Sequence, residues 1–403
     1  MKKSIYATAL AATAALTLAA CGAAPEDEET AAPATDGGET TAAETTGAAE
    51  EVDYLACLIS DQGGWEDQSF NQSAMEGLDR AVAELGVQKG DAESQSDADF
   101  GPNVDAMVQE GCDLTIGVGF LLEDPIQAAA EGNTDLSFGL VDATFSDPGA
   151  TADDPPTPVE LPNAKPIIFN TAEASYLAGY VAAGMTQTGT VATFGGLPIP
   201  SVSIFMDGFV DGVARYNEDN GTDVNVLGWD KESQDGSFAG TFEDQAQGVA
   251  LAEGFIAQGA DIIMPVAGPV GLGAASAAES AGDTWIIGVD SDWYDSTDYG
   301  SIVLTSVVKE IGAGVFETIE QGLGGEFSGE PYIGTLENGG VSLAEFHDFD
   351  AEVPDELKDA VADLQAQIIN GELVVETENA PRCPVLAPAR PAPVGAVPRK
   401  TLT

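Results

Sequence analysis

The central part of this chain alternates short apolar segments with longer helical patterns, and that alternation limits the fold more than any other feature. Apolar runs predict strands at about 54–59, 113–118, 137–141, 166–169, 190–194, 223–228, 261–265, 285–289 and 301–305. Helical periodicity predicts helices at about 71–86, 102–110, 124–131, 172–186, 202–218, 241–258, 270–281 and 307–322. Strands that are each followed by a helix indicate an α/β fold, with parallel sheets covered by helices on both faces. The length of this region suits two such sheets rather than one.

The N-terminus has the pattern of an export signal. Lys2 and Lys3 precede an apolar stretch at 5–18, and the sequence LAAC then ends at Cys21. The apolar stretch is shorter than the roughly 20 residues that span a bilayer, and Cys21 after two small residues resembles a bacterial lipobox. We expect residues 1–20 to be a lipoprotein signal peptide, and Cys21 to carry the lipid that anchors the protein on the outside of the cell membrane. The alternative is an ordinary secretory signal with an accidental cysteine.

Two segments have the composition of disordered chain. Residues 21–52 are rich in Ala, Thr, Gly, Glu and Asp and contain no aromatic or basic side chain. Such a segment cannot bury enough apolar surface to offset the entropy lost on ordering, so we expect an acidic linker there. From 379 to 403, Pro, Ala and basic residues replace the acidic composition, which predicts a disordered tail.

The charge balance excludes one class of partner. The chain has 13 basic and 68 acidic residues, and its formal net charge is -55. A protein that binds nucleic acid through its phosphates needs a basic patch, so we expect no nucleic acid partner. Uniform acidity is also typical of proteins in high salt, where screening removes the self-repulsion. A salt-adapted source is therefore a hypothesis from composition.

Cysteine usage fits an exported protein. Cys57 lies in one apolar strand and Cys112 directly precedes another. Adjacent strands of one sheet would bring the two sulfur atoms within bonding distance, although spacing alone does not fix the geometry. The sequence therefore leaves two alternatives, which are a Cys57–Cys112 disulfide and two buried thiols.

The strand-to-helix turns carry the most specific patterns. In open parallel sheets, ligands bind beyond the carboxyl ends of the strands, which is where these turns lie. The turns read DQGGWEDQSFNQSA at 61–74, GVGF at 117–120, VDA at 141–143, FGG at 194–196, IFMDGF at 204–209, PVAG at 265–268, GVDSD at 288–292 and LTSVVK at 304–309. In this order, across about residues 53–345, they resemble the basic membrane protein family of lipoproteins, also called PnrA-like. The SFNQS segment is the most specific of these matches.

The resemblance implies a fold, a function and a partner. The fold is the two-lobed type I periplasmic-binding fold, with lobes at 53–170 plus 306–330 and at 171–305 plus 331–378. The function is that of a nucleoside receptor, with purines as the expected ligands, and the partner is the permease of an ATP-binding-cassette importer. We expect a monomer without cofactor, metal ion or catalytic residue, whose lobes close on the ligand by hinge motion.

The resemblance also implies that two aromatic rings, one per lobe, hold the base between them. Phe70 in the SFN match and Phe205 in the FxxGF match occupy these positions. Stacking a base on an aromatic face contributes about 1–3 kcal/mol and tolerates different bases. The alternative is that both are core residues, and Phe209 on the same predicted helix as Phe205 is able to exchange roles with it.

Polar side chains in the turns complete the expected site. By the same resemblance, Asp61, Asn71 and Asp142 are candidates for binding the base, and Asp290 is the candidate for the ribose hydroxyls. A carboxylate is an acceptor with two oxygens, which suits paired hydroxyls or a purine N–H edge; taken alone, each of these residues is a helix cap or turn former. We expect three further residues beside the ligand: Lys309, Gly119 and Gly268.

Two other functions are weighed against the binding protein. The segment DSDWYDSTD at 290–298 superficially resembles a calcium loop, as a calcium-dependent nucleoside hydrolase would need, but Asp295 replaces the sixth-position glycine and the twelfth-position glutamate is absent. His347, the single histidine, has no cysteine or histidine nearby in the sequence, which argues against a zinc site or a catalytic triad. A ligand-binding sensor for another solute, such as a sugar, remains an alternative.

Three expectations concern less regular segments. Residues 145–163 form a Pro-rich, acidic insertion, which we expect to be a flap or a mobile loop. We expect Glu66 and Asp67 to face solvent. Trp229 and Trp293 are candidates for residues that set the size of the ligand.

Overall fold

The computed structural model describes residues 49–148 and 156–381. The predicted signal peptide, the anchor residue Cys21, the linker up to residue 48 and the tail from residue 382 lie outside the described residues. No helix of the described part has the length and apolar composition needed to cross a membrane.

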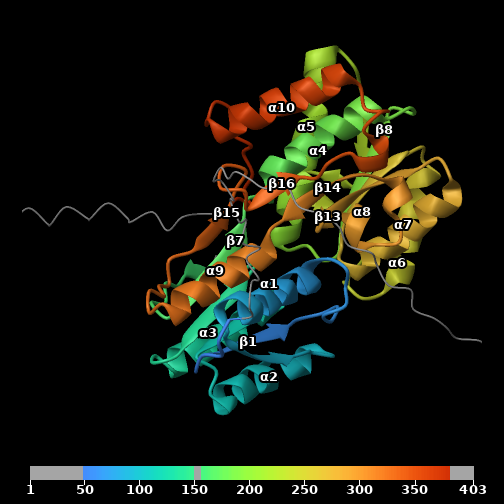
Figure 1. The fold of residues 1–403 in the computed structure, drawn as a ribbon. Helices are drawn as coiled ribbons and strands as arrows, with labels where there is room; N and C mark the ends of the chain where they lie inside the picture. Colours follow the sequence, from blue (N-terminus) through green and yellow to red (C-terminus); the bar gives the residue numbers. More distant parts are fainter. Residues whose placement is uncertain (1–48, 149–155, 382–403) are drawn as a thin grey trace, which may run out of the picture. The chain divides into compact units, whose positions relative to one another are not determined.

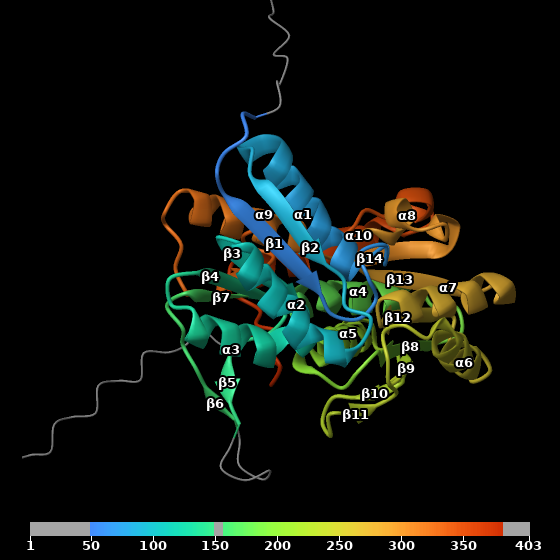
Figure 2. The same ribbon diagram turned by 90° about the horizontal axis from the view of Figure 1, so that it is seen from below.

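The first sheet is wholly parallel and contains six strands. Their order is β15 (Tyr332–Gly334), β7 (Ala164–Phe169), β4 (Ser137–Val141), β3 (Leu114–Val118), β1 (Leu55–Ser60) and β2 (Gln88–Ala92). Its helices are α1 (Phe70–Leu85), α2 (Asp97–Glu110), α3 (Glu123–Gly132) and α9 (Ile311–Leu323), with the short η1 (Phe120–Leu122) before α3. Figure 2 shows α1 and α9 on one face of this sheet and α2 and α3 on the other.

The second sheet has the same number of strands and one antiparallel edge. Its order is β16 (Val341–Leu343), β14 (Val303–Lys309), β13 (Trp285–Asp290), β12 (Ile262–Val266), β8 (Thr190–Gly195) and β9 (Asn225–Leu227), and only β16 is antiparallel to its neighbour. Its helices are α4 (Thr171–Met185), α5 (Pro200–Asn220), α6 (Gln245–Ile256), α7 (Pro269–Ala281), α8 (Trp293–Ser296) and α10 (Asp355–Ile369), with short η2 (Gly300–Ile302) and η3 (His347–Phe349) (Figure 1). The predicted α/β class with helix-flanked parallel sheets is confirmed.

Each strand expected from the sequence is present, and all but β9 are runs of largely buried side chains. The helix expected at 307–322 begins later, at Ile311, since the buried strand β14 continues to Lys309. Several elements had no prediction, among them β2, β15, β16, α8 and α10. Strand β2 reads QKGDA and is largely exposed, so it lacks the apolar run by which the other strands were found.

The chain passes between the sheets three times, after β7, after β14 and after β15. Lys309 still belongs to the second sheet, and β15 belongs to the first. The proposed lobe boundaries at 306 and 331 therefore shift to between Lys309 and Ile311 and to between Gly334 and Val341. With these shifts, the division into two lobes stays a proposal.

The close packing of α4 against α5 fixes the orientation of these two helices on the second-sheet side of the molecule. A side chain at Gly179 would collide with the carbonyl oxygen of Phe209, and one at Gly212 would collide with that of Tyr176. Only glycine allows two helix backbones to approach so closely. This contact sets the rotation of α5 about its axis, and with it the direction in which Phe205 points.

Cys57 and Cys112 form a disulfide, with their Cα atoms 6.0 Å apart. Cys57 lies on β1, and Cys112 directly precedes β3, the neighbour of β1 in the sheet. The structure thus settles the choice between a disulfide and two thiols in favour of the disulfide.

In the insertion at 145–163, β5 (Ser146–Asp147) and β6 (Thr157–Pro158) pair as an antiparallel hairpin, which lies beside α3 in Figure 2. A second short hairpin pairs β10 (Trp229–Asp230) with β11 (Asp235–Gly236).

Candidate functional site

A cavity of about 520 Å³, mouth included, is lined by residues of both sheets. Its walls come from the turns that follow β1, β3, β4, β12, β13 and β14 and from the starts of α1 and α5, so it lies at the carboxyl ends of the strands. All nine site residues expected from the sequence line it: Asp61, Phe70, Asn71, Gly119, Asp142, Phe205, Gly268, Asp290 and Lys309. The structure thus brings together the full predicted set.

Lys309 lies at the centre of the site. Its ammonium nitrogen is 2.7 Å from a carboxylate oxygen of Asp142 and 3.2 Å from one of Asp290. All three side chains are almost fully buried. Burial by itself lowers the pKa of Lys309, but the charges of Asp142 and Asp290 raise it above its ordinary value. Burial raises the pKa of Asp142, and the charge of Lys309 opposes that rise. Asp142 is contributed by the first sheet, so this ion pair joins the two sides of the cavity.

Both carboxylates are presented by the same backbone device. Asp142 directly follows β4 and Asp290 ends β13, and each has a φ of 68°. That left-handed conformation is uncommon for residues other than glycine, and Asp is among the few that adopt it readily. It turns the chain sharply at the strand end and directs the side chain into the cavity.

Aromatic rings surround the ammonium group of Lys309. The nitrogen lies 4.8 Å from the centre of the Phe70 ring and 5.4 Å from that of Phe205, within the range of a cation–π interaction. Phe70 begins α1 and Phe205 lies in α5, so the two rings are contributed by opposite sheets. Phe205 and Phe209 are both fully buried, but only Phe205 lines the cavity, which excludes an exchange of roles between them.

On the first-sheet side, Asp61 is enclosed by polar backbone. It directly follows β1 and accepts backbone hydrogen bonds, while burial raises its pKa well above the ordinary value and nearby Asp142 raises it further. A side chain at Gly119 would collide with the Asp61 carboxylate, and Gly119 also has a φ of 116°. Glycine is therefore required there by Asp61 and by the backbone. Gly268 has open space around it, and its φ of 51° is what favours glycine.

The expectation that Asp67 faces solvent is wrong. Its carboxylate is 3% exposed and accepts hydrogen bonds from the backbone N–H groups of Ser69, Asn71 and Gln72. These donors belong to the first turn of α1, where N–H groups lack partners within the helix. Burial nevertheless raises the pKa of Asp67 to about 6. Its neighbour Glu66 is exposed, as expected.

Sequence reasoning missed several residues of the wall. They are Gln62, Phe120, Ile199, Ser201, Val202, Phe242, Val266, Ala267 and Pro269, and Asp67 lines the cavity as well. Four of these residues lie in the strand-to-helix turns described from the sequence, and their position in those turns would have predicted a place in the wall: Gln62, Phe120, Val266 and Ala267. Phe242 comes from an irregular segment and packs against Gly196, where a side chain would collide with its ring. Periodicity gives no signal for such a contact.

Two buried polar atoms of the site have no hydrogen-bond partner among the described residues. They are the side-chain oxygens of Asn71 and Gln62. The amide nitrogen of Asn71 donates to the carbonyl oxygen of Gln62, which leaves the Asn71 oxygen available as an acceptor. Buried acceptors are normally satisfied, so this wall is suited to a ligand that supplies N–H or O–H donors.

Trp229 and Trp293 do not line the cavity. The indole N–H of Trp229 donates to Asp207, and that of Trp293 donates to the carbonyl oxygen of Val289. Both rings are buried in the second-sheet side of the molecule. The hypothesis that they set the size of the ligand is therefore wrong.

The paired helix-flanked sheets, with a cavity that joins charged and aromatic groups at the strand ends, define a solute-binding protein of the type I periplasmic-binding class. A solute-binding protein of an ABC transporter system from Aeropyrum pernix K1 has this fold, with a TM-score of 0.69 and 26% sequence identity, over 80% of this chain and 92% of that one. A family model described as ABC transporter substrate-binding protein PnrA-like matches residues 56–379. The chain belongs to this family of transporter binding proteins.

Curated relatives agree with the family assignment. The ABC transporter nucleoside-binding protein BmpA of Lactococcus lactis subsp. cremoris is 31% identical over 347 residues, which cover 81% of this chain and 90% of the relative. Basic membrane protein A of Borreliella burgdorferi is 27% identical over 330 residues, which cover 81% of this chain and 88% of the relative.

Proposed function

We propose that this protein binds nucleosides, purine nucleosides above all, in the cavity between its two sheets and delivers them to the permease of an ABC importer. The observation that carries the proposal is the pair Phe70 and Phe205, contributed by opposite sheets and lying around Lys309. Two aromatic faces at one cavity suit a flat base, and stacking of this kind accepts more than one base. The name of the Lactococcus lactis relative supports a nucleoside ligand.

The polar groups suit the rest of a nucleoside. With its pKa raised by burial, Asp61 holds a proton more readily than an ordinary carboxyl. A protonated carboxyl offers one donor and one acceptor, which matches the alternating edge of a purine. The free oxygen of Asn71 is a second acceptor beside it. Asp290 lies on the opposite wall, where its carboxylate oxygens are suited to accept hydrogen bonds from ribose hydroxyls.

Small-molecule sites have volumes of roughly 300–1,000 Å³ and enclose most of the surface of their ligand. Of the 520 Å³ of the cavity, which includes its open mouth, only about 60 Å³ is open to a water-sized molecule. The two walls therefore have to move apart to admit a nucleoside. A site with contributions from both sheets also links capture to movement of one lobe against the other, and a permease recognises the closed form.

The N-terminal sequence supports a location of this protein outside the cell membrane. A signal peptide at 1–20 would direct export, and a lipid on Cys21 would anchor the binding domain through the acidic linker at 21–52. Relatives that are named lipoproteins and basic membrane proteins support this part of the proposal. Mass spectrometry of the membrane-extracted protein tests it, because diacylation adds a defined mass to a peptide that begins at Cys21.

A calcium-dependent nucleoside hydrolase is disfavoured by one feature of the site. Such an enzyme needs carboxylates that are free to bind the metal ion. Here Asp142 and Asp290 both pair with the ammonium group of Lys309, which places a fixed positive charge where a calcium ion would have to bind. We therefore propose a binding protein without catalysis.

Calorimetry of the chain without residues 1–21 tests the ligand. Inosine, adenosine and guanosine should bind at one site per chain, uridine and cytidine should bind more weakly, and ribose should produce no saturable signal. Absence of binding to every nucleoside would remove the ligand from the proposal and leave the fold unaffected. Release of free base from inosine in the presence of calcium would instead reveal an enzyme.

A further inference from the structure

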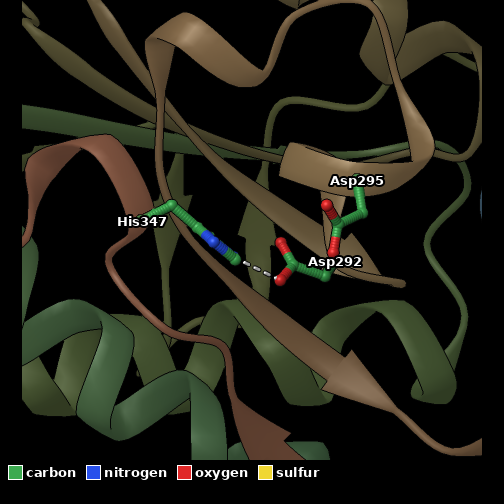
Figure 3. A group of neighbouring side chains, drawn as sticks. All are labelled: Asp292, Asp295 and His347. Carbon is green, nitrogen blue, oxygen red and sulfur yellow. Dashed lines mark hydrogen bonds and ion pairs between the residues drawn. The ribbon is translucent and has the colours of Figure 1, made fainter. Parts of the chain in front are cut away.

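Three potential metal ligands meet outside the binding cavity. Asp292, Asp295 and His347 each offer a ligand atom, and these atoms all lie within 4.8 Å of one another. Asp292 and Asp295 belong to the start of α8, whereas His347 begins η3, some fifty residues further along the chain. Figure 3 shows the imidazole directed at the Asp292 carboxylate, with the Asp295 carboxylate beside it. The search of the sequence for partners of His347 missed this group, because the fold brings the three together.

Contacts with neighbouring groups hold two of the three side chains in place. One oxygen of Asp292 accepts from the backbone N–H of Tyr294, which leaves the other oxygen directed at His347. The His347 ring stacks on Tyr294 at 4.0 Å with an interplanar angle of 4°, and the Tyr294 hydroxyl donates to Asp348. Metal-binding histidines and carboxylates are commonly oriented by such contacts from groups that do not touch the metal.

The one basic partner of the two carboxylates among the described residues is His347 itself. Among the described residues, neither Asp292 nor Asp295 pairs with a lysine or arginine. The Asp295 carboxylate has no hydrogen-bond partner in that part of the chain. Asp295 is exposed, and what distinguishes this group from a solvated acidic surface is the histidine beside it, since imidazole is a ligand in its own right.

We propose that Asp292, Asp295 and His347 bind a divalent transition-metal ion of the zinc type, with water completing the coordination. One imidazole and two carboxylates suit zinc rather than calcium or magnesium, which prefer oxygen ligands alone. Ligand atoms about 2.0–2.2 Å from a tetrahedral zinc ion stand roughly 3.3–3.6 Å from one another. The His347 nitrogen and the Asp292 oxygen are 2.6 Å apart, so binding requires them to separate by under about 1 Å. Both side chains are partly exposed, so the movement is open to them on the solvent side, and it loosens the contacts with Tyr294 that hold them.

Because of the position of the cluster, a bound metal ion would connect two segments of the chain. Asp292 lies two residues after Asp290 of the binding cavity, and His347 lies shortly after β16 at the edge of the second sheet. Ser291, between the two aspartates, donates to the carbonyl oxygen of Gln68 on the first-sheet side. A metal ion here would tie the segment after β16 to the loop that carries Asp290 and Ser291.

The test uses the untagged chain without residues 1–21, freed of metal by a chelator. Zinc chloride is titrated by calorimetry in excess magnesium, which occupies unspecific carboxylates on so acidic a surface. We expect one zinc site per chain. Because His347 is the only histidine, the same titration followed by NMR should shift a single set of imidazole resonances.

Two variants and one control decide the assignment. Removing a group that merely orients a ligand lowers metal affinity by roughly 10- to 100-fold, so D295N and H347Q should each lower it by at least that much. D298N removes the same charge from an exposed residue of the same loop and should leave the affinity unchanged. The Asp295 carboxylate is exposed and makes no hydrogen bond with the described residues, so its variant should fold normally. Equal zinc affinity in D295N and D298N, or unmoved imidazole resonances, would overturn the proposal and leave His347–Asp292 as a simple ion pair.

Discussion

The two walls of the cavity differ in charge. The first-sheet wall contributes Asp61, Asp67 and Asp142 and no basic side chain, whereas the second-sheet wall contributes Lys309 together with Asp290. Burial raises the pKa of each of the three first-wall carboxyls, and mutual repulsion adds to the rise for Asp61. The first wall is thus poorly compensated by itself, and the second wall supplies the cation that compensates it. Contact between the walls therefore compensates part of the negative charge of the first wall.

Removing the cation should have the largest effect on this arrangement. In K309M, Asp142 and Asp290 remain buried without a cation, and breaking a buried ion pair in this way costs about 3–5 kcal/mol of unfolding free energy. Urea denaturation at pH 7 measures the loss, and calorimetry should detect no nucleoside binding.

The matched control is K89M. It also removes one positive charge, but from the exposed pair with Asp79, which contributes under about 1 kcal/mol. Comparable losses in K309M and K89M would mean that net charge, and not compensation between the walls, determines stability.

The walls also differ in covalent support, since the disulfide lies wholly within the first sheet. Replacing both Cys57 and Cys112 by alanine should lower the unfolding free energy by about 2–4 kcal/mol, because the cross-link restricts the unfolded chain. Hydrogen exchange followed by mass spectrometry locates the effect. We expect faster exchange in β1 and β3, with β12 and β13 less affected. A uniform increase over both sheets would show that they unfold as one unit.

Asp67 makes the stability of the folded chain depend on pH. Its pKa is raised to about 6 from an ordinary 3.8, so the folded chain holds this proton more tightly than the unfolded chain. The contribution of Asp67 to stability is therefore greatest below about pH 4 and is lost as the pH rises through about 6. Relative to the wild type, D67N should gain roughly 2–3 kcal/mol between pH 4 and pH 7.

Urea denaturation across this pH range measures the difference. E66Q, at the exposed neighbouring residue, is the charge-matched control, and the Asp67 effect is the part that exceeds it. A loss of stability in D67N with rising pH would mean that the three backbone donors outweigh burial, and that the pKa lies below its ordinary value.

The site residues also differ in how well the sequence predicts them. Asp142 and Asp290 directly follow or end apolar strands, and in a parallel sheet a strand end already fixes where a side chain lies. The sequence predicts Lys309 inside a helix at 307–322, whereas the structure places it at the end of β14. The role of Asp67 depends on the backbone angles of one turn, so composition suggested solvent where the fold places a helix cap. Phe242 reaches the cavity from a distant segment, and Asp292 and Asp295 lie far from His347 in the sequence. No local sequence pattern predicts these contacts.

Replacing Phe70 tests the aromatic contribution of the first wall, where the smallest effect is expected. F70A should weaken nucleoside binding by about 1–3 kcal/mol, which is roughly 5- to 150-fold in the dissociation constant. Phe70 is only partly buried and begins α1, so stability should change little by comparison. F70Y keeps an aromatic face and should retain most of the affinity. If F70A binds as tightly as the wild type, Phe70 does not stack on the base, and the aromatic contribution belongs to the second wall alone through Phe205.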